Sequence, residues 1–408
     1  MTELSQDNRA LKVLYCILDN RFGGPHRRAH ALSLRLREYN VETLFLTGRK
    51  TDDVWQPDDV TVFHLKHLQC FQRRRSLWNL LQFAGWLPYN VLRICRLIRS
   101  HGITIVHVDG IVNFVPALAA WWTRTPVVWH YNDYPPRPLR WALLHVVRAL
   151  ADTVIVQGEK LKEARTASDP KLHRKTVVLR SGIDLREFDP SRYDAQAKAG
   201  LRQEWGVPAD RPLIGMIGNM NRFKGHAYFV RAAQRIKEQV KDARFLVVGR
   251  KLNTDPDYWD RMQQLTAACG LQNDLIFTGF REDVAGLLSA LDVFVLPSTL
   301  ESCPNVVLEA MAMRVPVVAT DVGAVSEQLA GGQAGLLVPS ADAEALARAV
   351  LECLRMPRQK VEAMVAAARD RVEQVFSLRE TAARQHQIYE RLVASRRARV
   401  SARPAPDP

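Results

Sequence analysis

Short apolar runs alternate with longer amphipathic segments along most of the chain. In the first half the apolar runs are rich in Val, Ile and Leu, and they cover 11–18, 42–47, 104–108, 126–131 and 152–157. Each run has the length of a strand, and the longer segments carry apolar residues at helical spacing, as from about His26 to Glu38. Strands that alternate with helices in this way predict a parallel sheet covered by helices.

A second series of the same type begins after a polar, turn-rich segment. Its apolar runs cover 212–218, 244–249, 275–279, 293–298 and 316–320. We therefore expect an α/β protein with two Rossmann-like domains that face each other across a cleft, at residues 1–190 and 191–376. Residues 377–395 should form a terminal helix and residues 396–408 a disordered tail.

Composition and length agree with this organisation. The chain has 408 residues, of which 47% are hydrophobic and 25% charged, and these globular values exclude a collagen-like, wholly disordered or extended coiled-coil chain. The six cysteines show no CxxC pairing, which argues against a disulfide scaffold or a zinc site and favours a reducing compartment. Neither a secretory signal nor an apolar run long enough for a membrane span is evident, so we expect a cytoplasmic protein.

The formal net charge of +14 favours anionic partners. No acidic residue occurs between Asp59 and Asp109, and this block interleaves arginines with aromatic residues on both sides of Pro88. Such a segment is typical of a helix at an anionic membrane surface, although a helix pair with buried leucines and solvated arginines fits equally well. The candidate membrane contacts are Arg73, Arg74, Arg75, Trp78 and Trp86. Nucleic acid is not expected, because no recognised binding motif accompanies the charge.

Two glycine-containing turns follow strands and open helices. In the first half these are Gly23 and Gly24, whose bare backbone could approach a phosphate or a sugar. The GxGxxG fingerprint is absent, which argues against a dinucleotide dehydrogenase. In the second half, a polar loop with Arg222 and Lys224 precedes Gly225 at the head of a helix. This loop presents two cations and helix amides to a phosphate, without the Walker spacing.

Two glutamates farther along the chain flank a predicted helix start. Glu301 and Glu309 are eight positions apart, and Pro304 suits the first turn of a helix that begins between them. One carboxylate can then accept hydrogen bonds from the hydroxyls of a pyranose, and the other can hold the vicinal diol of a ribose. Backbone amides near Asn305 would face the diphosphate between them. Alternatively, Glu309 is a solvated helix residue and Glu301 a capping acid.

The motifs resemble, in order, those of the retaining nucleotide-sugar-dependent glycosyltransferases of family 4 (glycosyl transferases group 1), which have the GT-B fold. The similarity is specific from about Pro212 to Val350, where it includes GNMNRFKG, the Glu-seven-residues-Glu motif ESCPNVVLE and AMAMRVPVVATDVGAVSE. It is looser in the first half, at FGGPHRRAHALSLRLR, PVVWHYNDY and VVLRSGIDLREFDP.

The resemblance implies a role for each matching residue. Lys224 would bind the donor diphosphate, Glu309 the ribose hydroxyls and Glu301 the transferred sugar. Gly23–Gly24 would approach that sugar and its phosphate from the other domain, and His130 would line the reaction centre.

Three positions depart from the family pattern. The family commonly has Arg where this chain has Asn219, so either Arg222 replaces it on the phosphates or diphosphate binding is weakened. The residues after the first glutamate differ from the usual Gly-Phe-Gly, which changes the side chains beside the sugar; they are Ser302, Cys303 and Pro304. Asp109 stands near where relatives often have a histidine, which leaves the acceptor contacts open.

By this resemblance the protein is a hexosyltransferase that moves a sugar from a nucleotide diphosphate to a glycan or lipid-linked acceptor with retention of configuration. No cofactor or metal is implied, and the Asp-x-Asp string at Asp255 lies in a proline-containing loop that we interpret as structural. We expect a role in envelope polysaccharide, lipopolysaccharide or glycolipid synthesis, peripherally on the inner face of the cell membrane. The alternatives are a nucleotide-sugar epimerase or phosphorylase of the same shape, and a degenerate subunit that binds without turnover.

Overall fold

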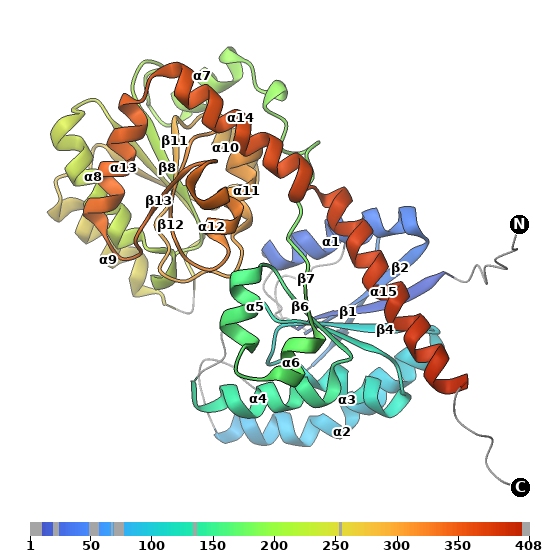
Figure 1. Cartoon of the computed structure of the whole chain (residues 1–408). Coiled ribbons are helices and arrows are strands. Elements are labelled where there is room, and N and C mark those ends of the chain that lie inside the picture. The colour runs from blue at the N-terminus through green and yellow to red at the C-terminus, as the bar shows by residue number, and fades with distance from the viewer. Residues whose placement is uncertain are drawn as a thin grey trace, which may run out of the picture. The chain divides into compact units, whose positions relative to one another are not determined.

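The computed structural model describes residues 10–18, 24–48, 57–66, 68, 77–133, 137–252 and 255–401. The chain divides into two compact units, one of Met1–Arg180 with Leu378–Pro408, and one of Ser181–Ser377 (Figure 1). The first unit thus ends at Arg180 rather than near residue 190, and the terminal helix belongs to it.

The first unit contains a seven-stranded sheet in which every pair of neighbouring strands is parallel. Its strands are β1 (Leu11–Ile17), β2 (Val41–Gly48), β3 (Val62–Leu65), β4 (Ile105–Asp109), β5 (Val127–His130), β6 (Thr153–Val156) and β7 (Thr176–Val178), in the spatial order β3-β2-β1-β4-β5-β6-β7. Its helices are α1 (Gly24–Leu36), α2 (Leu77–Ser100), α3 (Phe114–Thr123), α4 (Arg137–Leu150), α5 (Glu159–Thr166), α6 (Pro170–Lys175) and α15 (Leu378–Ser401).

The second unit repeats the design with a six-stranded parallel sheet in the order β10-β9-β8-β11-β12-β13. The strands are β8 (Leu213–Ile217), β9 (Arg244–Val248), β10 (Leu275–Gly279), β11 (Val293–Leu296), β12 (Val317–Thr320) and β13 (Leu336–Val338). The helices are α7 (Ala195–Glu204), α8 (His226–Gln239), α9 (Asp257–Ala268), α10 (Val284–Ser289), α11 (Asn305–Ala312), α12 (Val325–Gln328), α13 (Ala343–Arg355) and α14 (Arg358–Val375). Two Rossmann-like units are therefore confirmed.

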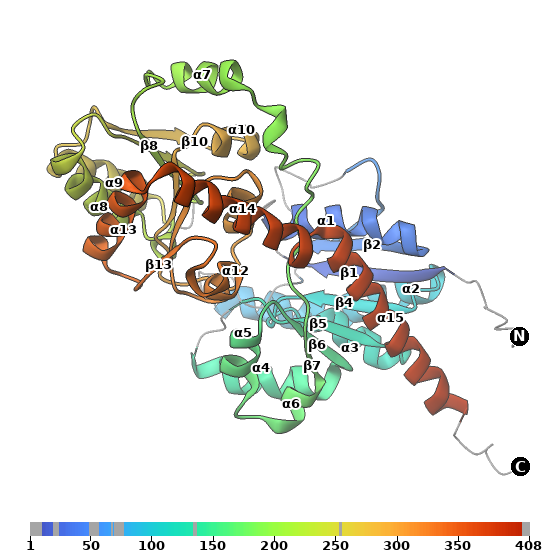
Figure 2. The same ribbon diagram turned by 45° about the horizontal axis from the view of Figure 1, so that its top comes forward.

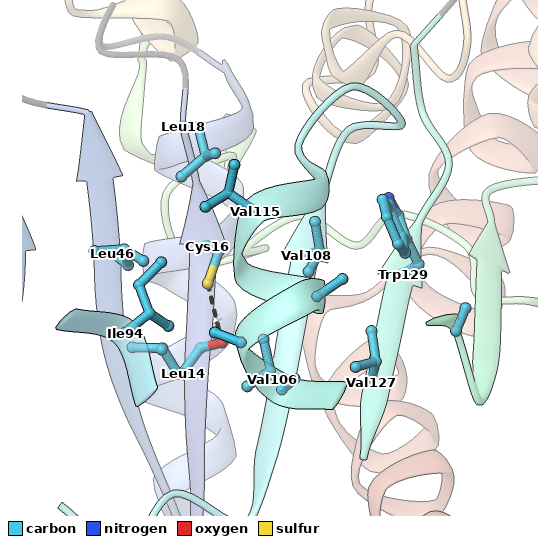
Figure 3. Close-up of a cluster of buried hydrophobic side chains, with 14 of the residues drawn as sticks. Leu14, Cys16, Leu18, Leu46, Ile94, Val106, Val108, Val115, Val127 and Trp129 are labelled. Carbon is cyan, nitrogen blue, oxygen red and sulfur yellow. Dashed lines mark hydrogen bonds between the residues drawn. The ribbon is translucent and has the colours of Figure 1, made fainter. Parts of the chain in front are cut away.

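Alternation along the strands separates two cores in the first unit. On one face, side chains such as Leu14, Val108 and Trp129 pack against α2 and α3, as Figure 3 shows. On the other face, Val13 and its neighbours pack against α1 and α15. Both faces of the sheet are covered, which explains the continuous apolar runs.

Helix α2 passes through Pro88 without a break. A proline inside a helix removes one backbone N–H and leaves the carbonyl four residues earlier without its partner. Here Pro88 and Ala84 are both exposed, so that water can bond the freed carbonyl. One long helix thus replaces the helix pair considered from the sequence.

Helix α15 continues to Ser401, so the segment expected to be a disordered tail is helical at its start, and residues 402–408 lie outside the described part. Within the extension, the Arg396 guanidinium donates to the Arg124 carbonyl at 2.9 Å and attaches this part of the helix to the end of α3.

A buried polar contact also attaches α15 to the sheet. His107 Nδ1 lies 2.7 Å from the Tyr389 hydroxyl, to which the Gln385 amide also donates. Burial, together with the nearby Arg28 charge, lowers the pKa of His107 to about 3. The histidine is therefore neutral in the fold across the physiological pH range.

This pKa predicts a loss of stability in acid. In the unfolded chain His107 takes up a proton below about pH 6.5, whereas in the fold it stays neutral down to about pH 3, so stability falls as the pH falls through this window. The group contributes up to about 1.4 kcal/mol per pH unit. Urea unfolding at pH 7 and pH 5 should show a smaller loss for His107→Gln than for the unsubstituted chain. Equal losses would contradict the assignment.

Candidate functional site

The loop after β8 is held by hydrogen bonds to its backbone and by a glycine with a positive φ. The Asn221 side chain accepts hydrogen bonds from the N–H groups of Phe223 and Lys224, at 2.9 and 3.2 Å, and so holds a short 3-10 turn. Gly225 then takes a φ of 72° and leads into α8. A Cβ at Gly225 would lie 1.8 Å from the carbonyl oxygen of Pro297, so only glycine allows this close approach.

This approach brings Lys224 to the end of the neighbouring strand β11. The Lys224 ammonium lies 2.7 Å from Glu301 Oε1, and the Ser298 hydroxyl donates to the same oxygen at 2.8 Å. The Glu301 side chain is only 11% exposed, so this ion pair is shielded from solvent. Two predicted site residues that are 77 positions apart in the chain are therefore in direct contact.

The loop between β11 and α11 is also held by the loop that follows β12. Gly323 has a φ of 58°, and a Cβ there would lie 2.4 Å from the carbonyl oxygens of Glu301 and Ser302. The Ala324 N–H donates to the Ser302 carbonyl at 2.8 Å, and the buried Cys303 sulfur accepts from the Gln328 amide at 3.3 Å. Ser302 and Cys303 thus shape the loop through packing and backbone contacts.

Helix α11 begins at Asn305, between the two glutamates as expected, and Pro304 is its N-cap residue rather than part of its first turn. Asn305 Oδ1 accepts a hydrogen bond from the Ser181 hydroxyl at 2.9 Å. Glu309 is half-buried at the fifth position of this helix, and Glu301 lies in the loop before it. The two glutamates therefore flank the helix N-terminus, where backbone N–H groups and the helix dipole favour an anion.

The two remaining residues predicted for the diphosphate are held by other groups. Asn219 is exposed, and its side-chain oxygen accepts from the Arg250 N–H at 3.3 Å. The Arg222 side chain is 70% exposed, and its Nε lies 3.2 Å from a carboxylate oxygen of Asp255. The Asp255 carboxylate also accepts a hydrogen bond from Arg261 at 2.8 Å. An exposed ion pair of this kind is weak, so Arg222 can exchange Asp255 for another anion.

In the first unit, His130 lies at the carboxyl end of β5 beside Asp109 at the end of β4. Neither ring nitrogen of His130 has a hydrogen-bond partner among the described residues, and Nδ1 is 3.8 Å from an Asp109 carboxylate oxygen. Burial and the Arg28 charge hold the pKa of His130 well below its usual value. The ring is therefore neutral near pH 7.

Sequence reasoning did not assign the groups that surround Asp109. Its carboxylate accepts from the Asn132 amide at 2.7 Å, from the Tyr15 hydroxyl at 3.2 Å and from the Arg28 guanidinium at 3.4 Å. The alternation along β1 and β4 places Tyr15 and Asp109 on the same face, which was the available signal for this cluster. Arg28, on α1, had none.

The chain matches two known families, one in each unit. Residues 22–187 match Glycosyltransferase Family 4, and residues 211–356 match Glycosyl transferases group 1. The second match contains the Lys224–Glu301 pair and α11. The chain belongs to the glycosyltransferases with the GT-B fold.

Individual relatives of this glycosyltransferase share about 30% identity over about half of the chain. It is 30% identical over 220 residues to the lipopolysaccharide core biosynthesis mannosyltransferase LpsB of Rhizobium meliloti, a match that covers 53% of this chain and 61% of the relative. It is 29% identical over 220 residues to the alpha-D-kanosaminyltransferase of Streptomyces kanamyceticus, covering 53% of this chain and 55% of that one. The chain thus spans little more than half the length of these curated relatives.

The fold extends over nearly the whole glycosyltransferase. The structure of HepE from Anabaena in complex with UDP and glucose has a TM-score of 0.77, with 22% identity and coverage of 94% of this chain and 99% of that one. A glycosyltransferase from Rickettsia africae also gives 0.77, with 20% identity and coverage of 94% and 98%.

The other predicted residues belong to the first unit or lie outside the described residues. Gly24 is the first residue of α1, and Gly23 lies outside the described residues. Of the candidate membrane contacts, Trp78 and Trp86 are exposed on α2, whereas 73–75 lies outside the described residues. Within the described part of the chain, no group of three or more His, Cys, Asp or Glu side chains is arranged to hold a metal ion.

The contact at Gly225 predicts that the glycosyltransferase tolerates no side chain there. Gly270 is a matched control, because it has a φ of 70° and open space around its Cβ position. Gly270→Ala should cost about 1 kcal/mol from backbone strain alone. Gly225→Ala should lower the melting temperature further and abolish nucleoside diphosphate binding in calorimetry, since the Lys224 loop must move. Two variants with the same melting temperature and intact binding would contradict the steric argument.

Proposed function

We propose that this protein transfers a hexosyl group from a nucleotide-diphosphate sugar to a glycan or lipid-linked acceptor, with retention of configuration. The observation that carries the proposal is the shielded contact between Lys224 and Glu301 at the mouth of α11. Within one small region, the Lys224 ammonium can bind the phosphates of a sugar diphosphate and the Glu301 carboxylate can accept hydrogen bonds from the sugar hydroxyls. The helix amides can stabilise the negative charge that develops on the leaving diphosphate.

The same groups support a specific course for the reaction. When the donor binds, Lys224 exchanges Glu301 for the diphosphate, and Glu301 then accepts hydrogen bonds from hydroxyls of the transferred sugar. The bond between the anomeric carbon and the phosphate oxygen breaks, and the acceptor oxygen bonds to the same face of that carbon. The acceptor proton passes to the leaving diphosphate, whose charge Lys224 and the α11 amides stabilise. Glu309 holds the ribose.

The similarities indicate which substrates to test first. One structural neighbour was solved with UDP and glucose, and one relative is a lipopolysaccharide core mannosyltransferase. We therefore propose an envelope glycan or glycolipid acceptor. A thermal-shift screen with UDP, GDP and ADP sugars tests the donor class, because a ligand that binds only the folded state raises the melting temperature. No shift with any of the three would contradict donor binding.

We also propose that the protein attaches peripherally to an anionic membrane through the acid-free block of residues 60–108. No helix in the described part of the chain has the length and apolar character needed to cross a bilayer. Support comes from α2, which has no acidic residue and exposes Trp78 and Trp86. The chain should be recovered with cell membranes at low salt and be released at high salt. Recovery that does not depend on salt would contradict an electrostatic attachment.

The two glutamates should differ in their effects on binding and turnover. Glu309→Ala should weaken nucleoside diphosphate binding in calorimetry by roughly tenfold or more, since one buried hydrogen bond to a charged group contributes about 1.5–3 kcal/mol. Glu301→Ala should not weaken that affinity, because it removes the carboxylate that competes for Lys224, but it should lower kcat, because the contact to the transferred sugar is lost. Unchanged affinity in Glu309→Ala would show that the ribose assignment is wrong.

The contributions of Lys224 and Arg222 to catalysis should be separable by substitution. Lys224→Ala should reduce kcat/KM by roughly two to three powers of ten, as expected when one preorganised charge stabiliser is lost. Arg222→Ala should approach this loss if Arg222 exchanges Asp255 for the diphosphate. Arg261→Ala is its matched control, since it removes the other partner of Asp255. If Arg222→Ala and Arg261→Ala both keep full activity, Lys224 acts without help from Arg222.

A further inference from the structure

Three consecutive helices cover one face of the sheet in the first unit. Helices α2, α3 and α4 lie side by side along this face (Figures 1 and 2), and their inner side chains form one core with the strands. They contain 24, 10 and 14 residues, and none of these residues is Asp or Glu. The acid-free character thus extends beyond the block of residues 60–108 to α3 and α4.

The outer side of this layer is rich in exposed tryptophan. Of the nine tryptophans in the chain, five lie on these three helices, and all five are exposed. They are Trp78 and Trp86 on α2, Trp121 and Trp122 on α3, and Trp141 on α4. The largest exposed fractions are 73% for Trp141 and 65% for Trp78. Large exposed aromatic side chains gathered on one side of a unit mark an interaction surface.

Helix α2 is apolar on two opposite sides. Its inner side buries residues such as Phe83 and Ile94 in the core. Its outer side exposes Leu81, Tyr89 and Leu92. A helix at the surface of a soluble unit normally has a polar outer side, so this second apolar side needs a partner other than water.

Cations accompany the aromatic residues on the same layer. Exposed arginines follow the aromatic residues on α2, end α3 and begin α4; they are Arg93, Arg96, Arg99, Arg124 and Arg140. Elsewhere, exposed helices pair arginine with glutamate one turn away, as in Arg348 with Glu344 and Arg358 with Glu362. Because α2, α3 and α4 have no acidic residue, no such pair forms within them.

We propose that the outer side of α2, α3 and α4, which we call the Trp–Arg surface, lies flat on an anionic lipid bilayer. Tryptophan rings prefer the headgroup depth of a bilayer, and arginines bind its phosphates and anionic lipids. The surface includes Trp121, Trp122 and Trp141, which lie outside the block that the sequence singled out. This inference rests on the peripheral attachment proposed above, which it extends from α2 to α3 and α4, and a lipid-linked acceptor gives that attachment a use.

The test uses the full chain and vesicles of phosphatidylcholine, either alone or with phosphatidylglycerol. Co-sedimentation should be strong only with the anionic vesicles and should weaken at high salt. The triple variant Arg93→Gln, Arg96→Gln, Arg99→Gln should bind at least tenfold more weakly. The control triple, Arg348→Gln, Arg355→Gln, Arg358→Gln, has the same net charge on exposed helices of the other unit and should bind as the unsubstituted chain does.

Tryptophan insertion is tested separately. Trp121→Ala with Trp122→Ala, and Trp141→Ala alone, should each weaken vesicle binding several-fold, whereas the exposed Phe280→Ala on the second unit should have no effect. Brominated lipids should quench tryptophan emission of the unsubstituted chain, and less so that of the variants. Normal melting temperatures would confirm that the variants fold.

Several results would overturn the inference. These are equal loss in the two arginine triples, full binding by the tryptophan variants, or no preference for anionic vesicles. Binding of an acidic protein in place of vesicles would also overturn it. Calorimetry with UDP, GDP and ADP, in the absence of lipid, keeps this surface apart from the proposed sugar transfer. The surface variants should bind nucleotide as the unsubstituted chain does, and failure of the unsubstituted chain to bind any of the three would concern the sugar transfer alone.

Discussion

The contact between Lys224 and Glu301 depends on how two parallel strands end. Strands β8 and β11 are neighbours and terminate at the same edge, so the loops that follow them must meet. Gly225 lets the first loop approach the carbonyl of Pro297, and Gly323 lets a third loop close on Glu301. The shielded ion pair results from this backbone packing, and Ser298 completes it. In the proposed function, a donor that replaces Glu301 on Lys224 would therefore meet groups that are already in position.

The first unit places buried polar groups at the corresponding edge of its own sheet. Along β4, Ile105 is followed on the same face by His107 and then by Asp109, so the face changes from apolar to charged toward the carboxyl end. Burying such groups costs free energy unless they are hydrogen-bonded, and Asp109 has three side-chain donors. His107 stacks on Tyr15, with ring centroids 4.2 Å apart, and contacts the Tyr389 hydroxyl of the terminal helix.

Much of the fold and part of the site could be predicted from the sequence. The long apolar runs predicted the central strands of both sheets, and Pro304 indicated that a helix starts between the two glutamates. The motifs singled out Lys224 and Glu301, but their contact with each other was not predicted. The short strands β3, β7 and β13 lie at sheet edges, where three or four residues give no clear period. The Arg28–Asp109 contact joins residues 81 positions apart and carries no local signal. The continuation of α15 beyond residue 395 includes the bond from Arg396 to the Arg124 carbonyl, a contact between residues 272 positions apart that has no local signal.

The most direct test of this account is acceptor-dependent release of nucleoside diphosphate. The full chain is incubated with radiolabelled UDP, GDP and ADP sugars, with and without an extract of envelope glycolipids, and free diphosphate and labelled glycolipid are measured together. The account predicts that one donor yields both products in equal amounts, that the extract is required, and that the anomeric configuration of the sugar is retained in the product. Nucleotide binding without release of diphosphate or labelling of any glycan would contradict it and would favour a binding subunit.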